Sequence, residues 1–372
     1  MQTPVTQYGG PGLPVWRITG HRLIRSLLAD PRLTPSHAAA SEKLRAMCPH
    51  ADVWGAGLSG ALNRADGAEY IRLRSMFGRA FSPTIVSRLR SSTTGCADML
   101  IAGFAERGHA ELIADYIRPL AVITTLDLLG VPGEDRREVA RLFTAGTDAQ
   151  EEARAYFTTA LPDLGGWIGC PDSPANIHGA PGLISLLAQL EGDGLKLTHD
   201  ELHAAFLLLL GTGATLTDVL SGALLHVVAD ESTSDKFRAQ TTGGALSVKA
   251  VNELLRYTYT GRDVLIRFAT EPLSIDGQAI SAGDAVLFDI AAANRDPSAF
   301  AEPDELRPDR TLNPHLSFGQ GPHNCLGAAV ARTQIGGALG ALLSQLPRLR
   351  PADAATWPAD GAPPTELHVE FS

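Results

Sequence analysis

The ten residues Phe318–Gly327, FGQGPHNCLG, carry the strongest signal in this 372-residue chain. They place Cys325 at the end of a glycine-punctuated loop, and the small, apolar segment that follows has the spacing of a helix. Gly319 and Gly321 allow a tight turn and a close approach of the backbone to a flat ligand. A helix N-terminus favours the thiolate form of a cysteine. The stretch therefore predicts a thiolate presented to an iron atom.

A lone cysteine is more often an inert buried residue than a ligand. The ordered set Phe-Gly-x-Gly-x-His-x-Cys-x-Gly changes that balance, because it resembles the haem-binding loop of the cytochrome P-450 superfamily. The resemblance implies that Cys325 is the axial ligand of haem b iron and a catalytic residue, since a thiolate favours O–O cleavage. It also implies that Phe318 packs near the sulfur, that His323 bonds a haem propionate, and that Gly319 and Gly327 belong to the cofactor-binding loop.

The resemblance extends over nearly the whole chain and implies the fold of that superfamily. This fold is mainly α with small β-sheets, a triangular helical prism around a buried haem, and we expect residues 1–372 to form a single domain. Alternation with turn signals at Asp276-Gly277 and Ala282-Gly283 predicts short strands over 262–290. Helical spacing is found over 69–103 with a break near Ser82, over 110–147 with breaks at 130–133, over 198–229 and 248–259, and from Leu326 onward.

Composition narrows the class of protein. The chain is 44% hydrophobic and 19% charged, which is ordinary for a soluble protein. We see neither an apolar run of the ~20 residues that span a bilayer nor a signal-peptide pattern. We therefore expect a cytoplasmic protein without membrane contact. Four cysteines without a CxxC pair argue against a zinc site and a disulfide scaffold. The net charge of −10 argues against nucleic acid as a partner.

Two arginines match superfamily positions that bind the haem propionates. They are Arg267 in LIRFAT and Arg74 in EYIRLR, and two propionates need cationic or hydrogen-bonding partners. Each arginine alone is equally compatible with a surface position. Tyr70 stands where the superfamily usually has histidine, and its hydroxyl can still donate one hydrogen bond.

Glu253 and Arg256 lie three residues apart on one predicted helical face. An exposed pair of this kind would contribute under ~1 kcal/mol. Their place before a strand region and the segment Asn294–Pro297 resembles the structural ion-pair network of the superfamily, which supports the haem loop. The resemblance therefore implies a role in folding and not in catalysis.

The segment LLLLGTGATLTD departs from the superfamily pattern small-Gly-x-acid-Thr-Thr. Alignment on Gly211 places Gly213 at the acid, Ala214 at the first threonine and Thr215 at the second. Gly211, Ala214 and Thr215 share one helical face, and the resemblance makes them catalytic candidates. In the superfamily the acid and alcohol relay protons to dioxygen. Here the protons would come from water, from Thr212 or Thr215, or from the substrate.

Glycines within a helix usually destabilise it by about 1 kcal/mol each. The two glycines of this segment indicate either a local kink over the haem or close packing, and we favour the kink.

The resemblance implies a haem-thiolate monooxygenase that hydroxylates a small organic molecule in bacterial secondary-metabolite biosynthesis, with electrons from ferredoxin and ferredoxin reductase. The missing acid and alcohol leave two alternatives open. One is oxidative aromatic cross-linking of a peptide or cyclodipeptide, and the other is a haem protein that binds a ligand or recruits a partner without turnover.

Two surfaces are expected for the partners. By the resemblance, the substrate pocket would be lined by three segments: 47–66 with Trp54, 160–182 and 258–266. Positive charge gathers at five arginines, namely Arg72, Arg79, Arg88, Arg90 and Arg332. They are compatible with an ordinary solvated surface and equally with a docking site for an acidic ferredoxin.

Overall fold

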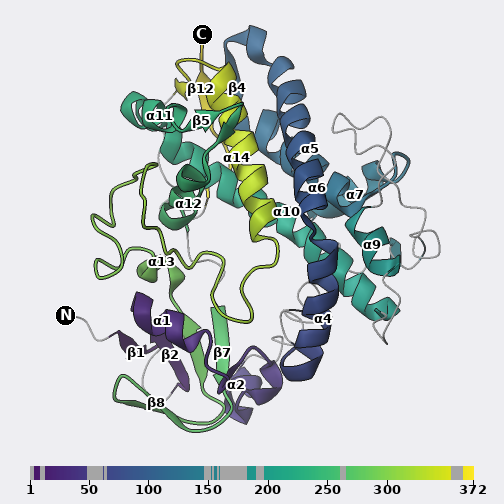
Figure 1. Ribbon diagram of the computed structural model, residues 1–372. Helices are drawn as coiled ribbons and strands as arrows, with labels where there is room; N and C mark the ends of the chain where they lie inside the picture. The colour runs from purple at the N-terminus through teal and green to yellow at the C-terminus, as the bar shows by residue number, and fades with distance from the viewer. Residues whose placement is uncertain are drawn as a thin grey trace. The chain divides into compact units, whose positions relative to one another are not determined.

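The computed structural model describes residues 4–8, 13–47, 62, 65–145, 152, 155–156, 159, 182–189, 197–259, 265–352 and 363–372. The chain divides into two compact units (Figure 1). The first comprises Met1–Arg74, Leu255–Leu306 and Thr311–Cys325, and the second comprises Ser75–Leu254, Arg307–Arg310 and Leu326–Ser372. Helices make up most of the described residues and the strands are short, which confirms the predicted fold class of a mainly α protein with small β-sheets.

The first unit is built on a five-stranded sheet in the order β1-β2-β10-β7-β3. β10 runs parallel to β2 and antiparallel to β7, so that Val286 lies between Trp16 and Arg267. Alternate side chains, among them Ile18, Val286 and Phe288, are buried in one apolar cluster. The strands are β1 (Val5–Gln7), β2 (Val15–Ile18), β3 (Leu33–Thr34), β7 (Leu265–Ala269) and β10 (Ala285–Phe288).

Short elements complete the first unit. Helix α1 contacts α13, and a hairpin joins β8 to β9 through Asp276 and Gly277, both with positive φ. A two-residue loop of this kind matches the right-handed twist of the strands, so the predicted turn at Asp276-Gly277 is confirmed. These elements are α1 (His21–Leu27), α2 (Glu42–Met47), β8 (Leu273–Ile275), β9 (Gln278–Ile280) and α13 (Ile290–Ala293).

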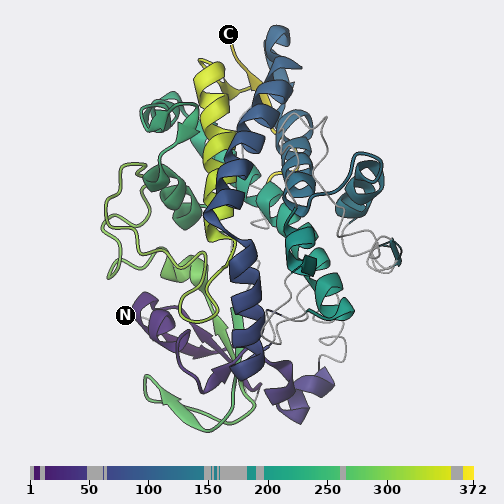
Figure 2. The same cartoon turned by 45° about the vertical axis from the view of Figure 1, so that its right-hand side comes forward.

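The second unit is helical. Its longest element, α10 (His199–Val228), begins with a capping box in which the Thr198 side chain accepts from the backbone N–H of Glu201. α10 contacts α6, α7, α9 and α14, and α14 lies along α5 (Figures 1 and 2). The remaining helices are α5 (Pro83–Ala102), α6 (Arg118–Leu129), α7 (Arg136–Ala145), α9 (Leu183–Gln189), α11 (Glu231–Arg238) and α14 (Ala328–Gln345).

Among the described residues, one stretch, Asp200–Val228 of α10, is long and apolar enough to cross a membrane. Half of its most apolar window is buried inside the protein, and the core helix of a soluble protein meets the same two criteria.

Two helices have residues in both units, α4 (Gly67–Ala80) and α12 (Val248–Tyr257).

The break predicted near Ser82 is confirmed, because Ser82 caps α5 by accepting from the N–H of Ile85. The break at 130–133 is also confirmed, since α6 ends at Gly130 with a φ of 83°.

Small antiparallel sheets and one short π-helix remain. They are β11 (Arg350–Pro351) with β12 (His368–Glu370) and β4 (His109–Glu111), β5 (Thr241–Thr242) with β6 (Ala245–Leu246), and the π-helix Ile113–Ile117.

Candidate functional site

The loop before Cys325 needs glycine at two positions. Gly319 and Gly321 have φ values of +69° and +77°, as the sequence predicts for a tight turn. A Cβ on Gly321 would also lie 2.9 Å from the carbonyl oxygen of Leu28. By contrast, a Cβ on Gly319 would make only ordinary van der Waals contacts, the nearest at 3.9 Å, so positive φ and not crowding requires glycine here.

Backbone hydrogen bonds fold the loop onto itself. The N–H of Cys325 donates to the carbonyl of Phe318 over 2.8 Å, and that of Asn324 donates to Gly321 over 3.2 Å. Cys325 is left exposed, and Gly327 caps the N-terminus of α14. The ring centroid of Phe318 lies 5.8 Å from that of His315, and the contact of Phe318 with the sulfur stays a prediction. The loop therefore presents a thiol shortly before a helix begins.

Tyr70 and Arg74 of α4 hold the three residues that precede Cys325. The buried Tyr70 donates its hydroxyl hydrogen to the carbonyl of Pro322 over 2.5 Å, and its ring stacks on that of His323 with centroids 3.8 Å apart. Arg74 donates from Nη1 to the Tyr70 hydroxyl over 2.9 Å and to the carbonyl of Asn324 over 2.6 Å. Its Nη2 donates to Oδ1 of Asn324 over 2.5 Å.

Arg267 on β7 is a buried cation with an exposed fraction of 8%. Its guanidinium makes one hydrogen bond to the described residues, from Nη1 to the carbonyl of Ile266 over 2.9 Å. Burial lowers the pKa of Arg267, and the nearby carboxylate of Asp66 opposes this shift. Because a guanidinium carries five donors, Arg267 retains several for an anion.

His323 lies in the same electrostatic environment. Burial and then the positive charge of Arg267 lower the pKa of His323, while Asp66, with its Oδ1 3.8 Å from Nε2, opposes them. The imidazole is therefore neutral near pH 7 and can donate one hydrogen bond.

These residues fit a flat, anionic cofactor such as haem. An exposed thiol matches an iron atom, and a buried guanidinium with spare donors matches a carboxylate. The fold brings five predicted site residues together within the first unit, namely Cys325, His323, Tyr70, Arg74 and Arg267.

Glu253 and Arg256 are both fully buried, as a role in folding requires. Glu253 accepts from Nε of Arg310 over 2.9 Å and from the N–H of Arg307 over 2.8 Å. Arg256 donates to the carbonyls of Asn294 and of two residues in the segment 303–305. A direct pair between Glu253 and Arg256 stays a prediction.

The sequence interpretation did not single out one residue that supports the haem-loop backbone, Asn294. The buried Asn294 accepts from the N–H of Leu316 over 2.8 Å and donates to the hydroxyl of Ser317 over 2.9 Å. It thereby fixes the backbone just before Phe318. The only sequence signal was its place in the segment Asn294–Pro297, since an asparagine alone indicates no particular partner.

The predicted catalytic face of α10 lies in the second unit. Ala214 and Thr215 are exposed and Gly211 is half-buried, whereas Gly213 is buried. The hydroxyl of Thr215 bonds none of the described residues, while that of Thr212 donates to the carbonyl of Leu209 over 2.6 Å.

Gly213 is explained by close packing. A Cβ at this position would overlap the ring of Phe143 on α7 and lie 2.5 Å from Oγ1 of Thr125 on α6. α10 is helical without interruption through this position. The favoured interpretation of a kink is thus not needed for Gly213, and the position of the superfamily acid is filled by the Phe143 ring.

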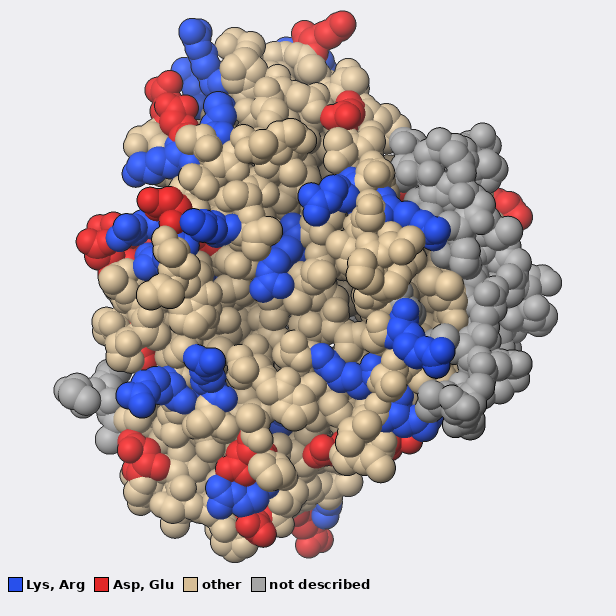
Figure 3. Space-filling model, viewed as in Figure 1, with Lys and Arg blue, Asp and Glu red and all other residues tan. Residues whose placement is uncertain are grey.

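The five predicted docking arginines differ in their contacts. Arg72 pairs with Glu69 over 2.7 Å, and Nε of Arg332 donates to Oδ1 of Asn252 over 2.7 Å. Arg79, Arg88 and Arg90 form no ion pair with the described part of the chain. Figure 3 shows Lys and Arg side chains over α5 and α14 with few Asp or Glu among them.

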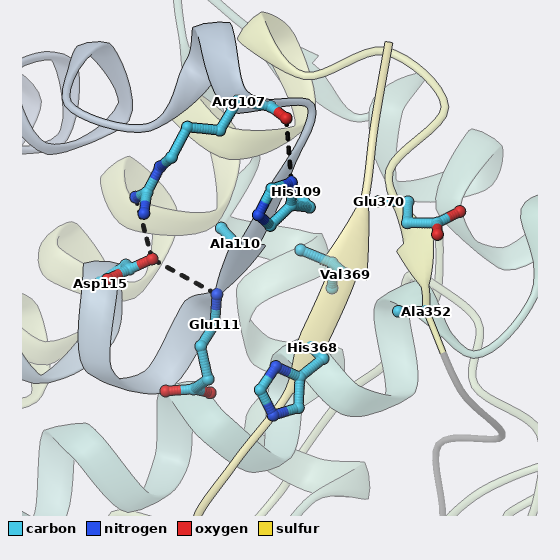
Figure 4. Close-up of a pocket in the computed structure, with 9 residues that line it drawn as sticks. All are labelled: Arg107, His109, Ala110, Glu111, Asp115, Ala352, His368, Val369 and Glu370. Atoms are coloured by element: carbon cyan, nitrogen blue, oxygen red, sulfur yellow. Dashed lines mark hydrogen bonds and ion pairs between the residues drawn. The ribbon is translucent and has the colours of Figure 1, made fainter.

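The expected substrate pocket lies largely outside the described residues. This applies to 48–61 with Trp54, 160–181 and 260–264. Figure 4 shows a different cavity, of ≈ 520 Å³, whose walls come from β4, β12 and their flanks and include no predicted site residue. Its charged groups are engaged in the fold, since Asp115 pairs with Arg107 and the carboxylate of Glu111 accepts from the N–H of Leu367.

Known proteins share this fold. A family model described as Cytochrome P450 matches residues 246–353. The polyketide biosynthesis cytochrome P450 PksS of Bacillus subtilis is 30% identical over 93% of this chain and 85% of its own length. Its solved structure matches with a TM-score of 0.84 and 27% identity, covering 100% of this chain and 94% of that one.

Two further relatives differ in the reaction that their names state. The 20-oxo-5-O-mycaminosyltylactone 23-monooxygenase of Streptomyces fradiae is 35% identical over 91% of this chain and 79% of its own. The solved structure of CxnD, described as an enzyme for C–S bond formation in chuangxinmycin biosynthesis, matches with a TM-score of 0.80 and 25% identity. That match covers 98% of this chain and 90% of CxnD.

Proposed function

The chain belongs to the cytochrome P450 family of haem-thiolate monooxygenases, and on that premise we propose that Cys325 ligates haem b in one domain spanning residues 1–372. The observation that carries this proposal is the loop Phe318–Gly327, which leaves Cys325 exposed two residues after His323, an imidazole whose pKa the buried Arg267 helps to lower. When bound, haem held by the Cys325 thiolate would supply the activation of dioxygen.

Different residues of the first unit would bind different parts of the haem. Arg267 would bind one propionate through its spare donors, and the neutral His323 would donate a hydrogen bond to a propionate. Arg74, whose Nε and remaining Nη2 hydrogen are not used by Asn324 or Tyr70, would add a further donor. Phe318, Gly319 and Gly327 would shape the surface on which the flat ring lies.

The substrate is proposed to be a small molecule of bacterial secondary metabolism, oxidised in the cytoplasm. The names of PksS and the 23-monooxygenase support this class, and the second of them supports hydroxylation. Electrons would come from a ferredoxin and its reductase. Arg79, Arg88 and Arg90, which form no ion pair with the described residues, would favour encounter with an acidic carrier.

Oxidative bond formation on a small peptide or cyclodipeptide is the second candidate. Gly213 and Ala214 replace the acid and alcohol of the family pattern, and CxnD offers a precedent for bond formation among the relatives. In this case the exposed hydroxyl of Thr215, water or the substrate itself would move the proton. A haem protein without turnover is the third candidate, and it would use reductant without forming product.

The first test concerns the ligand. We expect Cys325→Ser to abolish the thiolate signature of the ferrous carbonyl complex. The matched control is Cys96→Ser, because burial raises the pKa of Cys96 to about 12 and keeps it a thiol. Retention of the thiolate signature in Cys325→Ser would refute the assignment.

The second test concerns the substrate. The purified ferric protein is titrated with macrolides, terpenoids, and aromatic peptides and cyclodipeptides while the Soret band is recorded. A ligand that shifts iron to high spin is then tested for turnover. A product with one added oxygen supports hydroxylation, a product that has lost two hydrogens supports coupling, and reductant use without product supports the third candidate.

A further inference from the structure

Every residue between the second loop glycine and Cys325 is held by α4. Tyr70 bonds the carbonyl of Pro322 and stacks on His323, and Arg74 bonds both the carbonyl and the side chain of Asn324. We propose that Tyr70 and Arg74 form a clasp that positions Cys325, and that Tyr70 binds the loop in place of a haem propionate. The inference deepens the proposed function and rests on it for the identity of the cofactor.

The first argument is a count of donors. A tyrosine hydroxyl has one hydrogen to donate. The carbonyl of Pro322 receives it over 2.5 Å, and the same hydroxyl oxygen accepts from Nη1 of Arg74 over 2.9 Å. Tyr70 therefore has no hydrogen left for a carboxylate, and the anion must be held by other donors, chiefly those of Arg267.

The second argument concerns what fixes the loop. Gly319 and Gly321 give it backbone freedom, and of its internal hydrogen bonds that of Asn324 to Gly321 is long, at 3.2 Å. Pro322, Asn324 and Cys325 are all exposed, so little of their surface is buried against other residues of the chain. The hydrogen bond from Cys325 to Phe318 closes the loop, and α4 adds four hydrogen-bonding and stacking contacts from outside it, through two side chains one turn apart.

The test uses the full-length, haem-loaded protein with Tyr70→Phe, which removes only the hydroxyl. Hydrogen exchange over the loop 318–325 should quicken about 3- to 10-fold, the change expected from one hydrogen bond. The thiolate-ligated ferrous carbonyl complex should convert to the thiol-ligated form faster by a similar factor, whereas the haem content should be unchanged.

Tyr116→Phe is the matched control. Its hydroxyl donates to a backbone carbonyl, that of Ala338, over 2.7 Å in the buried interior of the second unit. This variant should lose overall stability without faster exchange in the loop. Should Tyr70→Phe misfold, Asn324→Ala removes one of the Arg74 contacts at an exposed residue and should quicken loop exchange in the same direction.

Two results would overturn the clasp. One is loop exchange in Tyr70→Phe equal to that in Tyr116→Phe. The other is unchanged exchange together with loss of haem, which would make Tyr70 a cofactor ligand. If the wild-type protein lacks the thiolate signature, the proposed function fails, and the exchange measurement still decides whether the clasp exists.

Discussion

Adding a single carbon at residue 213 should destabilise the helical unit. In Gly213→Ala the new Cβ would overlap the ring of Phe143, with Cζ 2.7 Å away, and lie 2.5 Å from Oγ1 of Thr125. Overpacking of a well-filled interior costs about 1–3 kcal/mol, and the better helix propensity of alanine returns about 1 kcal/mol. Because both neighbours are buried, the upper half of that range applies, and the net loss should be about 1–2 kcal/mol.

Urea unfolding followed by circular dichroism measures this difference directly. Gly78→Ala is the matched control, because Gly78 lies in helix α4 and a Cβ added there would have nothing within 4 Å. It should gain up to about 1 kcal/mol from helix propensity alone. Phe143→Leu combined with Gly213→Ala should recover part of the loss, as a coupling between residues in contact. A Gly213→Ala variant as stable as Gly78→Ala would refute the packing argument.

Three further outcomes are expected. If Thr215, water or the substrate already supplies protons, Ala214→Thr should leave the native product unchanged and give no large gain in hydroxylation. The mass of the product measures this, and a large gain in hydroxylation would contradict the reasoning. In the haem-free protein the folded pKa of His323 is lowered, first by burial and then by Arg267. Its free energy of unfolding should therefore fall as the pH drops below about 6.5, where only the unfolded imidazole takes up a proton. His323→Gln should flatten that slope in urea titrations of the haem-free protein at several pH values. Glu253→Gln should cost about 3–5 kcal/mol in the same unfolding assay, because it leaves Arg310 buried without its carboxylate. Glu138→Gln, whose pair with Arg141 is exposed, should leave the free energy of unfolding nearly unchanged.

Local signals account for the parts of the fold that the sequence could predict. Ser82 followed by proline, Thr198 followed three residues later by glutamate, and Asp276-Gly277 each fix their own backbone through neighbours in the chain. The loop glycines 319 and 321 belong to the same class, because a positive φ is a property of one residue.

Contacts between distant residues account for the rest. Nothing near Gly213 in the sequence indicates that the ring of Phe143 fills its Cβ position, because the two residues meet only when α7 packs on α10. Tyr70 was expected to contact the cofactor, and its hydrogen-bond partner, the carbonyl of Pro322, is a backbone group without a sequence signature. Side-chain identity restricts the possible chemistry, and the tertiary structure selects the partner.

The parallel pairing of β2 with β10 has a consequence for how the chain is made. Val15 is hydrogen-bonded in register with residues around Ala285, so β2 leaves the ribosome long before its neighbour has been synthesised. Until then β2 has only β1 beside it, and the other edge of this two-stranded ribbon is open to pairing with other chains. Non-local pairing of this kind is slow and exposes the growing chain to aggregation. Expression at reduced temperature or with added chaperones should therefore raise the yield of folded protein more than it would for a helical protein with local contacts.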